Sequence, residues 1–486
     1  MNESRVVVER DPKKKPDHID ALENASIFPL IFRLSFAAVM SEIAQMIYEM
    51  FDSAFISIYN GESVLGGVSA FLFLESLISI QIGISVGISV AAVISHALGE
   101  GNMMRAKKAL LYFIVFGCLW TIAIPAIFIP LLPRILPLVG VEEFVMAETR
   151  EYAIVVVAGS GFTYFVCGFS AILKAENLAI TSMFITVIPA VLNFIGDPLL
   201  MRVLDLGVFG AGISTVVANF IGILVTIFLY VRSNSPIAIR LSKDVIKAPT
   251  DKDVLKTIAS LAIPNYIFNC NINIGGILAS NNISRYSDSD TQTMQWIAIY
   301  GSAARIGNMV FRPCKGISNS IPTILGFNIG AKNWKRSWES IWKSFISIAL
   351  FSWFLAGLIN VFSREIASLL SSTSTMEDTL TYISRITTIP MFFSALYMTT
   401  FGIFQSERSS FFQIYTAIIG WFGMITSIFL IPHLVGSVDG FRYVLLSVHS
   451  INITGAVILA PWKIKKYIKL KNDEEKKEEE EVEQKV

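Results

Sequence analysis

Charged residues are scarce in this sequence, because Asp, Glu, Lys and Arg make up 16% of its 486 residues. An ordinary soluble protein contains about 25%. Cysteine and histidine are rarer still, with four of each. The cysteines form no CxxC pair and lie in apolar stretches, which argues against a disulfide framework. The net charge is +1, so no bulk electrostatic attraction to nucleic acid is expected.

Recognisable catalytic motifs are also missing from the sequence. It contains no phosphate loop of the form GxxxxGK[ST], no GxSxG nucleophile elbow and no HExxH zinc motif. It also shows no clustered set of metal ligands. We therefore expect neither an enzyme nor a bound cofactor, and no ATP hydrolysis by this chain.

Hydrophobic residues, by contrast, make up 53% of the chain, and its mean hydropathy is +0.60. Apolar runs of about 20 residues recur along it, and each can cross a bilayer core about 30 Å thick. Helices are expected, because in lipid every backbone polar group must be satisfied within its own segment. The sequence therefore predicts an all-α membrane protein of about twelve transmembrane helices. We place them near residues 27–58, 64–97, 109–132, 150–173, 178–201, 208–231, 256–284, 294–329, 341–363, 380–404, 410–433 and 439–462.

Basic residues are unevenly distributed between the predicted loops. With an even number of helices, both tails and alternate loops lie on one side of the membrane. Roughly 28 of the 39 basic residues fall on this side and about 7 in the opposite loops. The asymmetry predicts cytoplasmic termini, and we expect a multi-pass protein of the plasma membrane.

The predicted helices and their orientation divide the chain into five parts. They are a cytoplasmic N-terminal tail, an N-lobe of six helices, a cytoplasmic linker, a C-lobe of six helices and a charged cytoplasmic C-terminal tail, at residues 1–26, 27–231, 232–256, 257–462 and 463–486. The low-complexity, Glu-rich composition of the last part predicts disorder.

Three short blocks recur in the two halves of the chain. The matching pairs are Gly99–Asn102 with Gly330–Asn333, Lys174–Glu176 with Gln405–Glu407, and Gly207–Gly210 with Ser437–Gly440, at offsets of 231, 231 and 230 residues. Each match is weak alone, but three at one offset in matching loops indicate an internal repeat. Parallel repeats of this kind occur in transporters, where substrate binds between the halves near the membrane midplane.

Acidic residues gather on one face of the first predicted helix. Glu42, Glu49 and Asp52, with Gln45, share a face about 80° wide. A charge at the centre of a membrane helix costs about 2.5–3.5 kcal/mol, so this face should point into the protein or a wet cavity. Neighbouring carboxylates disfavour one another's ionisation, which is the property that a proton carrier needs. Pairing of these acids with buried arginines is the alternative interpretation.

The fifth predicted helix contributes Asn193 and Asp197, which share a helix face at i and i+4. An amide beside a carboxylate can hydrogen-bond to either of its protonation states. A structural Asp at the helix end, next to Pro198, is the alternative. Glu75 in the second helix is a further intramembrane acid, and we include it among the candidates for the substrate cleft.

The second half shows the opposite chemistry. Its eighth helix carries a stripe of basic and amide side chains, and its seventh helix carries three Asn residues on one face and no acid. These residues are Arg305, Asn308, Arg312, Lys315 and Asn319 in the eighth helix, and Asn265, Asn269 and Asn273 in the seventh. One interpretation is that salt bridges between the lobes gate the cleft. The other is that the stripe receives an anionic group of the substrate.

Several segments resemble the multidrug and toxic compound extrusion (MATE) family, from about Ser26 to Trp462. They are Phe51–Ile56, Leu98–Asn102, Leu173–Asn177, Asn193–Pro198, Gly207–Thr215 and Ile321–Asn333. The resemblance implies two six-helix bundles, a central cleft, and export of organic compounds in exchange for protons or sodium.

The resemblance also implies a location for the coupling cation. Asp52, Asn193 and Asp197 resemble the N-lobe cation site of the DNA-damage-inducible branch, and Thr215 matches a further polar member of that site. Acids in the seventh and tenth helices, which bind sodium in another branch, are absent. This favours proton coupling in the N-lobe, with Glu49 and Glu42 as additional candidates, while a sodium ion at Asp52, Asn193 and Asp197 stays open.

The expected partners are small organic substrates and the lipid bilayer, but not nucleic acid, and we expect the monomer to be functional. A related flippase for a lipid-linked or anionic substrate is the nearest alternative. A membrane-embedded enzyme would need clustered nucleophile, base or metal ligands at one membrane face. A channel would be excluded by saturable, proton-coupled flux.

Overall fold

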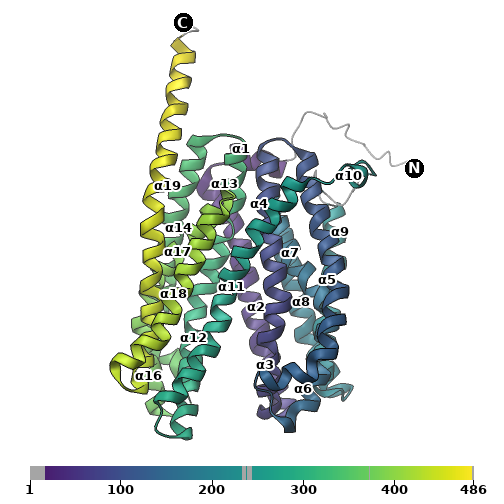
Figure 1. Cartoon of the computed structure of the whole chain (residues 1–486), viewed down its shortest axis with the longest axis vertical. Helices are drawn as coiled ribbons and strands as arrows, with labels where there is room; N and C mark the ends of the chain where they lie inside the picture. The colour runs from purple at the N-terminus through teal and green to yellow at the C-terminus, as the bar shows by residue number, and fades with distance from the viewer. Residues whose placement is uncertain (1–16, 233–236, 238–242, 372, 484–486) are drawn as a thin grey trace, which may run out of the picture.

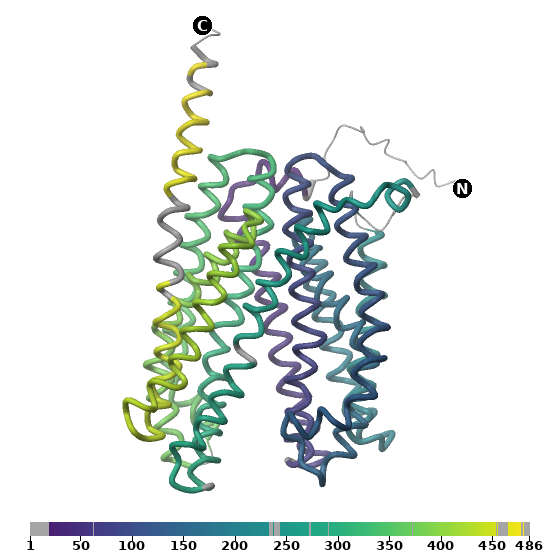
Figure 2. Tube along the Cα trace, viewed as in Figure 1, coloured from purple at the N-terminus to yellow at the C-terminus, as the bar shows by residue number. Residues whose placement is uncertain are grey.

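The structure, a computed structural model, describes residues 17–232, 237, 243–371 and 373–483. Within these ranges all regular structure is helical and no strand occurs. The helices form two bundles that stand side by side and diverge toward one end (Figure 1). Helix α1 and the last turns of α19 lie at the other end, which we call the terminal end (Figure 2). The predicted N-terminal tail and linker fall partly outside the described residues.

The N-lobe begins with the short helix α1 (Asp17–Asn24) and contains six spans. Its elements are α2 (Ile27–Asn60), α3 (Glu62–Glu75), the π-helical η1 (Ser76–Ile80), α4 (Gln81–Gly99), α5 (Met103–Leu138), η2 (Glu143–Val145), α6 (Met146–Ala158), α7 (Ser160–Ala175), α8 (Ala179–Pro198), the π-helical η3 (Leu199–Val203) and α9 (Gly207–Arg232). The second span is therefore α3, η1 and α4 in series, and the fourth is α6 with α7.

The C-lobe follows the short helix α10 (Lys243–Lys247) and also contains six spans. Its elements are α11 (Lys252–Tyr286), α12 (Asp290–Ser318), α13 (Ile321–Gly330), α14 (Trp334–Val361), α15 (Ser363–Leu370), α16 (Ser374–Thr388), α17 (Met391–Ser406), α18 (Ser410–Val435), η4 (Val438–Tyr443) and α19 (Val444–Glu483). The two lobes together account for the twelve predicted spans.

The described spans differ in how apolar they are. Seven helices are long and apolar enough to cross a membrane, and two bent pairs raise this number to nine. The bent pairs are α6 with α7, at 52°, and α16 with α17, at 45°. Two spans of the C-lobe are less apolar: α11, and α12 with α13. These two carry the amide and basic stripes.

The predicted eighth helix, 294–329, was wrong as a single element. It is divided into α12 and α13, with Asn319 and Ser320 between them. Pro322 stands in the first turn of α13, where its missing N–H needs no partner. A proline inside a continuous helix would have removed one hydrogen bond, so the sequence favours a new helix start at this position.

The prediction of a disordered C-terminal tail was also wrong, because α19 continues as a helix to Glu483. Lys and Glu are good helix formers and stabilise a helix when they pair four residues apart. Lys471 and Glu475 form such a pair, with Nζ and Oε1 3.4 Å apart. The tail is also anchored, since the backbone N–H of Lys335 donates to Oε2 of Glu474 at 2.8 Å.

The internal repeat is visible in the backbone. Asn102 caps α5 by accepting from the Arg105 N–H at 3.0 Å, and Asn333 caps α14 by accepting from the Arg336 N–H at 2.9 Å. Left-handed backbone conformations recur at the same offset of 231 residues. The matching pairs, with their φ angles, are Gly101 (72°) with Lys332 (57°), Asn177 (60°) with Arg408 (55°), and Asp205 (54°) with Gly436 (73°).

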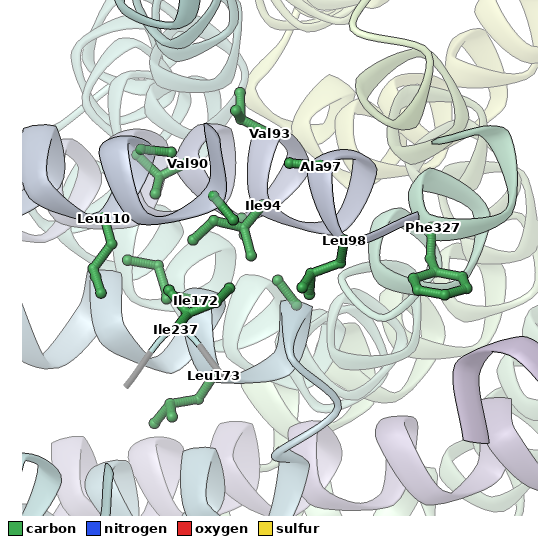
Figure 3. Close-up of a cluster of buried hydrophobic side chains, with 14 of the residues drawn as sticks. Val90, Val93, Ile94, Ala97, Leu98, Leu110, Ile172, Leu173, Ile237 and Phe327 are labelled. Carbon is green, nitrogen blue, oxygen red and sulfur yellow. The ribbon is translucent and has the colours of Figure 1, made fainter. Parts of the chain in front are cut away.

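The lobes are in close contact at the terminal end, where α4 packs against α13. A Cβ atom on Gly99 would lie 2.0 Å from the carbonyl oxygen of Phe327, and one on Gly330 would lie 2.2 Å from that of His96. We call this crossing the seal. Phe327 joins the hydrophobic cluster of α4, α5 and α7, which includes Val90, Ile94 and Ile172 (Figure 3). One apolar core therefore extends from the N-lobe into α13.

Candidate functional site

Five polar residues of the N-lobe meet inside the bundle, and we call them the N-lobe cluster. They are Asp52 from α2, Asn193 and Asp197 from α8, and Ser214 and Thr215 from α9. Asp52 is 5% exposed, Asn193 2% and Asp197 0%, so neither carboxylate is a solvated helix end. The structure thus brings together Asp52, Asn193, Asp197 and Thr215, which the sequence placed on three separate helices.

A glycine allows the helices of this cluster to come close together. A Cβ atom on Gly196 would lie 2.5 Å from Oγ of Ser214, so α8 and α9 can touch only because this side chain is absent. The contact aligns the polar groups on both helices. Nδ2 of Asn193 donates to Oγ1 of Thr215 at 3.0 Å, and Oγ of Ser214 donates to the Asn193 carbonyl at 3.3 Å.

The cluster contains an excess of hydrogen-bond acceptors. Among the described residues, no hydrogen-bond partner of standard geometry exists for Oδ1 of Asp52, Oδ1 of Asn193 or either carboxylate oxygen of Asp197. The carboxyl groups of Asp52 and Asp197 lie close enough to interact directly. Buried acceptors without partners are costly, and two carboxylates in one buried site repel each other when both are ionised. A proton or a small cation would relieve both penalties.

Two tyrosines complete the cluster, and the sequence analysis missed them. Tyr48 lies beside Thr215 and near Asp52 and Asp197, while Tyr152 of α6 is 1% exposed and lies near the same carboxylates. Tyr48 is one helical turn before Asp52, so the criterion that found Glu42 and Glu49 could also have found it. No local pattern points to Tyr152, because its contact with the cluster depends on how α6 packs.

Glu49 faces the other lobe and pairs with Arg312 of α12. Nη1 of Arg312 donates to Oε1 of Glu49 at 2.9 Å, and Nη2 donates to Oε2 at 2.6 Å. Two parallel bonds between a guanidinium and a carboxylate hold both groups in a defined orientation. This contact is a salt bridge between the lobes, as the first of the two interpretations of the basic stripe expects. Close packing of α2 on α12 supports it, since a Cβ atom on Gly316 would lie 3.0 Å from the Ala38 backbone.

Glu42 is separate from the N-lobe cluster, about three helical turns from Asp52 toward the terminal end of α2. It is half-buried and lies within electrostatic range of Lys174 on α7 and Lys315 on α12. No ion pair within 4.0 Å links Glu42 to either lysine in the described part of the chain. Its neighbourhood is therefore a loose cluster of charges at the interface between the lobes.

Glu75 is buried, with 4% of its surface exposed, and it ends α3 directly before the π-helical η1. π-Helical turns leave carbonyl groups without their usual partners and are common at functional sites. Here Nε1 of Trp120 donates to the Ile78 carbonyl at 3.0 Å, and the hydroxyl of Tyr266 donates to the Leu77 carbonyl at 3.3 Å. Because Tyr266 belongs to α11, the irregular turn beside Glu75 is also a contact between the lobes.

The remaining candidates belong to the C-lobe. Asn265 is buried and donates to Oγ of Ser89 at 3.3 Å across the interface, and Asn269 donates to the Asn265 carbonyl at 2.8 Å. Arg305 is exposed on α12 and has no ion pair among the described residues. The side chain of Asn273 lies outside the described residues. The structure therefore places Asn265 and Arg312 between the lobes.

No group of three or more His, Cys, Asp or Glu side chains suited to a metal ion occurs within the described residues. A sodium ion would have to be held by two carboxylates together with amide and hydroxyl oxygens. Such oxygen ligands occur in the N-lobe cluster at Asp52, Asp197, Asn193 and Thr215.

Comparison with known protein families identifies one match. The model of the MatE family matches residues 37–199 and 266–430, one segment in each lobe, which together cover more than half of the chain. Among curated proteins, the chain is 26% identical over 353 residues to "Probable multidrug resistance protein NorM" of Thermotoga maritima, covering 70% of this chain and 72% of that protein. It is 19% identical over 447 residues to "Multidrug export protein MepA" of Staphylococcus aureus, covering 92% and 96%.

Solved structures share the fold. One is described as the outward-facing conformation of a multidrug resistance MATE family transporter of the MOP superfamily, with a TM-score of 0.85 and 18% identity over 95% of this chain and 100% of that one. Another is a MOP superfamily transporter from Pyrococcus furiosus, whose binding pocket is described as having reverse polarity. Its TM-score is 0.81, with 19% identity over 94% of this chain and 100% of that one.

Proposed function

Because the chain belongs to the MatE family of membrane transporters, we propose that it exports small organic compounds in exchange for protons, with sodium as the alternative coupling cation. The observation that carries this proposal is the N-lobe cluster, in which four oxygens of two buried carboxylates and an amide have no hydrogen-bond partner of standard geometry among the described residues. A proton or a small cation would satisfy this excess of acceptors. Its curated relatives are named for multidrug resistance and export, which supports small organic compounds as the substrates.

Coupling requires that the cation binds the two states of the transporter with different affinity. In our proposal, protonation of Asp52 or Asp197 removes their mutual repulsion and supplies an O–H donor to the acceptors around them. The hydrogen bonds of Asn193, Ser214 and Thr215 then transmit this change between α8 and α9. Tyr48 lies one turn from Asp52 on α2, so the same change also reaches the helix that contacts the C-lobe.

The contacts between the lobes support alternating access. In this structure the seal at Gly99 and Gly330 and the Glu49–Arg312 ion pair hold the lobes together, while the bundles diverge toward the opposite end (Figure 1). We propose that the terminal end is cytoplasmic, in agreement with its excess of Lys and Arg, and that the structure is an outward-facing state. Export then requires these contacts to open and re-form in each cycle.

The second candidate function is movement of an anionic or lipid-linked substrate through the same cleft. The observation that favours it is the positive charge on α12, where Lys315 forms no ion pair within 4.0 Å in the described part of the chain. This candidate shares the cation site and the alternating-access movement, and differs only in the charge of the cargo.

The proposal is tested with purified protein in lipid vesicles, with pH and sodium gradients imposed separately. We expect a pH gradient alone to drive uptake of a cationic dye, ethidium, by the wild type. The Asp52→Asn variant should transport at the level of empty vesicles, because an amide cannot exchange the proton. The matched control is Glu142→Gln, which removes a negative charge from an exposed residue between α5 and α6 and should leave transport unchanged.

Other outcomes separate the alternatives. If only a sodium gradient drives uptake, the coupling cation is sodium and not the proton. The N-lobe site still holds in that case if Asp52→Asn is inactive. Normal proton-driven uptake by Asp52→Asn would remove the N-lobe cluster from the mechanism. If neither gradient drives ethidium but one of them drives an organic anion, the second candidate function takes precedence.

A further inference from the structure

A small cavity lies between the lobes, lined by residues of α4, α11, α12, α13 and α17. Its polar lining residues are Asn265 and Asn269 of α11, Lys315 and Ser318 of α12, Asn319 directly after α12, and Gln405 of α17. No Asp or Glu lines it. The N-lobe contributes Ile88 of α4, whose carbonyl accepts from Nε2 of Gln405 at 3.2 Å. The cavity therefore lies on the interface, with a C-lobe lining that carries one cation and no anion.

Lys315 is the charged group of this cavity, and it lacks a direct partner. No hydrogen bond or ion pair reaches its Nζ within the described residues, although the side chain is only half exposed or less. An ammonium has three N–H donors and no acceptor, so it can be satisfied only by acceptor atoms. A partly buried ammonium without a partner is unfavourable, and a negatively charged oxygen from a ligand is the partner that fits it best.

The surroundings of Lys315 contain more cations than anions. The groups whose charges act on it or are acted on by it are Glu42, Glu49, Arg312 and Lys174. Glu49 is neutralised by its two bonds to Arg312. Glu42 then faces two lysines, Lys174 and Lys315, which leaves one positive charge without a counter-charge. A ligand with a single negative charge would balance this site.

The other part of the cavity lining is apolar. Phe268 and Phe401 both belong to it, and their rings stack on each other with centroids 4.1 Å apart. Met398 and Pro322 complete the apolar lining. Aromatic rings bind a planar hydrophobic group by offset stacking or edge contacts, and methionine adapts its shape to such a group. The cavity therefore combines one cation with a lining that is partly apolar and aromatic.

We propose that this cavity is a binding site for amphiphilic organic monoanions, in which the anionic group of the ligand binds Lys315 and its apolar part contacts Phe268, Phe401 and Met398. The amide groups of Asn269 and Gln405 are placed to contact further polar atoms of the ligand. This inference rests on the proposed export function, because it names a class of compound that the cleft would accept.

The test is direct binding to purified protein in lipid nanodiscs, with empty nanodiscs as the blank. Three probes of similar shape are used: 2-naphthoate, its neutral amide 2-naphthamide, and the cation 2-naphthylmethylammonium. We expect the anion to bind at least about tenfold more tightly than the amide, a difference of about 1.4 kcal/mol, and the cation to bind most weakly. Equal binding of all three probes would overturn the proposal.

Substitutions around the cavity should weaken or strengthen the binding of 2-naphthoate, depending on the charge that they remove. Lys315→Gln should weaken binding of 2-naphthoate by about tenfold, whereas Lys315→Arg should retain it. Glu42→Gln removes the competing carboxylate and should strengthen binding of the same probe. The control is Lys469→Gln, whose side chain is exposed on α19 and which should have no effect. Unchanged binding by Lys315→Gln, or weaker binding by Glu42→Gln, would contradict the site.

The failure of this site and the failure of the proposed function are distinguishable. If the pH gradient drives ethidium transport that depends on Asp52, while 2-naphthoate binding is absent or independent of Lys315, the export function stands and the anion site is wrong. If 2-naphthoate binding follows Lys315 and Glu42 as predicted, while neither gradient drives any transport, the anion site stands and the export function is wrong.

Discussion

The two lobes have the same backbone plan and opposite chemistry. In both, an Asn caps the helix after the seal, and left-handed residues occur at positions 231 residues apart. The side chains that face the cleft do not repeat. Helix α2 carries Glu42, Glu49 and Asp52, whereas α12 carries Arg312 and Lys315. The repeat therefore preserved what the fold needs, namely caps, turns and close helix crossings, while the charged residues diverged.

This difference assigns separate tasks to the lobes. The acids of the N-lobe are close to one another and short of donors, which suits them to take up a cation. The cations of the C-lobe are spread along α12, where one pairs with Glu49 and another faces the cavity between the lobes. The asymmetry thus separates a coupling site inside one lobe from contacts that involve both.

The largest effect is expected at the symmetric seal. In Gly99→Ala the new Cβ would lie 2.0 Å from a backbone oxygen, which no change of rotamer can relieve. Overpacking of this kind costs about 1–3 kcal/mol, so the population of the state closed at the terminal end should fall by about fivefold to a hundredfold. Spin labels at Lys107 and Lys335, in a variant without native cysteines, would report the distance between the lobes.

The internal repeat predicts the same effect at the matching glycine of the other lobe. Gly330→Ala should have the same effect, since its Cβ would lie 2.2 Å from the His96 carbonyl oxygen. Gly357→Ala is the control, because a Cβ there has no other atom within 4 Å. A normal distance distribution in both seal variants would contradict the crossing that the structure shows.

Part of this arrangement was predictable from the sequence. Apolar runs located the spans, and the Gly and Asn residues of matching loops revealed the repeat, because both signals are local. A helical wheel also placed Glu49 and Arg312 on polar faces. It could not determine that these two faces meet, since that depends on how α2 and α12 pack. Tyr152 was missed for the same reason, because its contact with the cluster depends on how α6 packs against the other helices.

A smaller effect tests whether the opposite charges of the lobes are in contact. Glu49→Gln or Arg312→Gln should each reduce the population of the closed terminal end by about fivefold, since a partly exposed ion pair contributes about 1 kcal/mol. The exchanged pair, Glu49→Arg with Arg312→Glu, should restore part of the loss. The same spin labels measure the outcome. If the exchanged pair is no better than the single variants, the contact contributes nothing to closure.

The elements that sequence analysis missed have physical reasons in common. The break at Asn319 and Ser320 and the helical C-terminal tail both arise from competition between local preferences. Pro322 favours a helix start inside a long apolar run, and the Lys–Glu pairs of the tail favour a helix in a segment whose composition resembles disorder. In each case the conformational preference of a few residues outweighed the composition of the longer segment around them.

The smallest effect concerns backbone strain at one pair of repeated positions. The N-lobe has glycine at Gly101, whereas the C-lobe has Lys332 in the same left-handed conformation, at a φ of 57°. Lys332→Gly should therefore stabilise the protein by up to about 1 kcal/mol, and Gly101→Lys should destabilise it similarly. Thermal unfolding in detergent measures both. Lys107→Gly, inside α5, is the control and should be destabilising by about 1 kcal/mol.

The central claim, that the N-lobe cluster holds the coupling proton, is tested most directly by counting protons. Ethidium is added to purified protein in a weakly buffered, sodium-free solution, and the released protons are measured. Because binding of cation and substrate are linked, the wild type should release protons when the dye binds. Asp52→Asn and Asp197→Asn should bind the dye and release none. Undiminished proton release by both variants would contradict the claim.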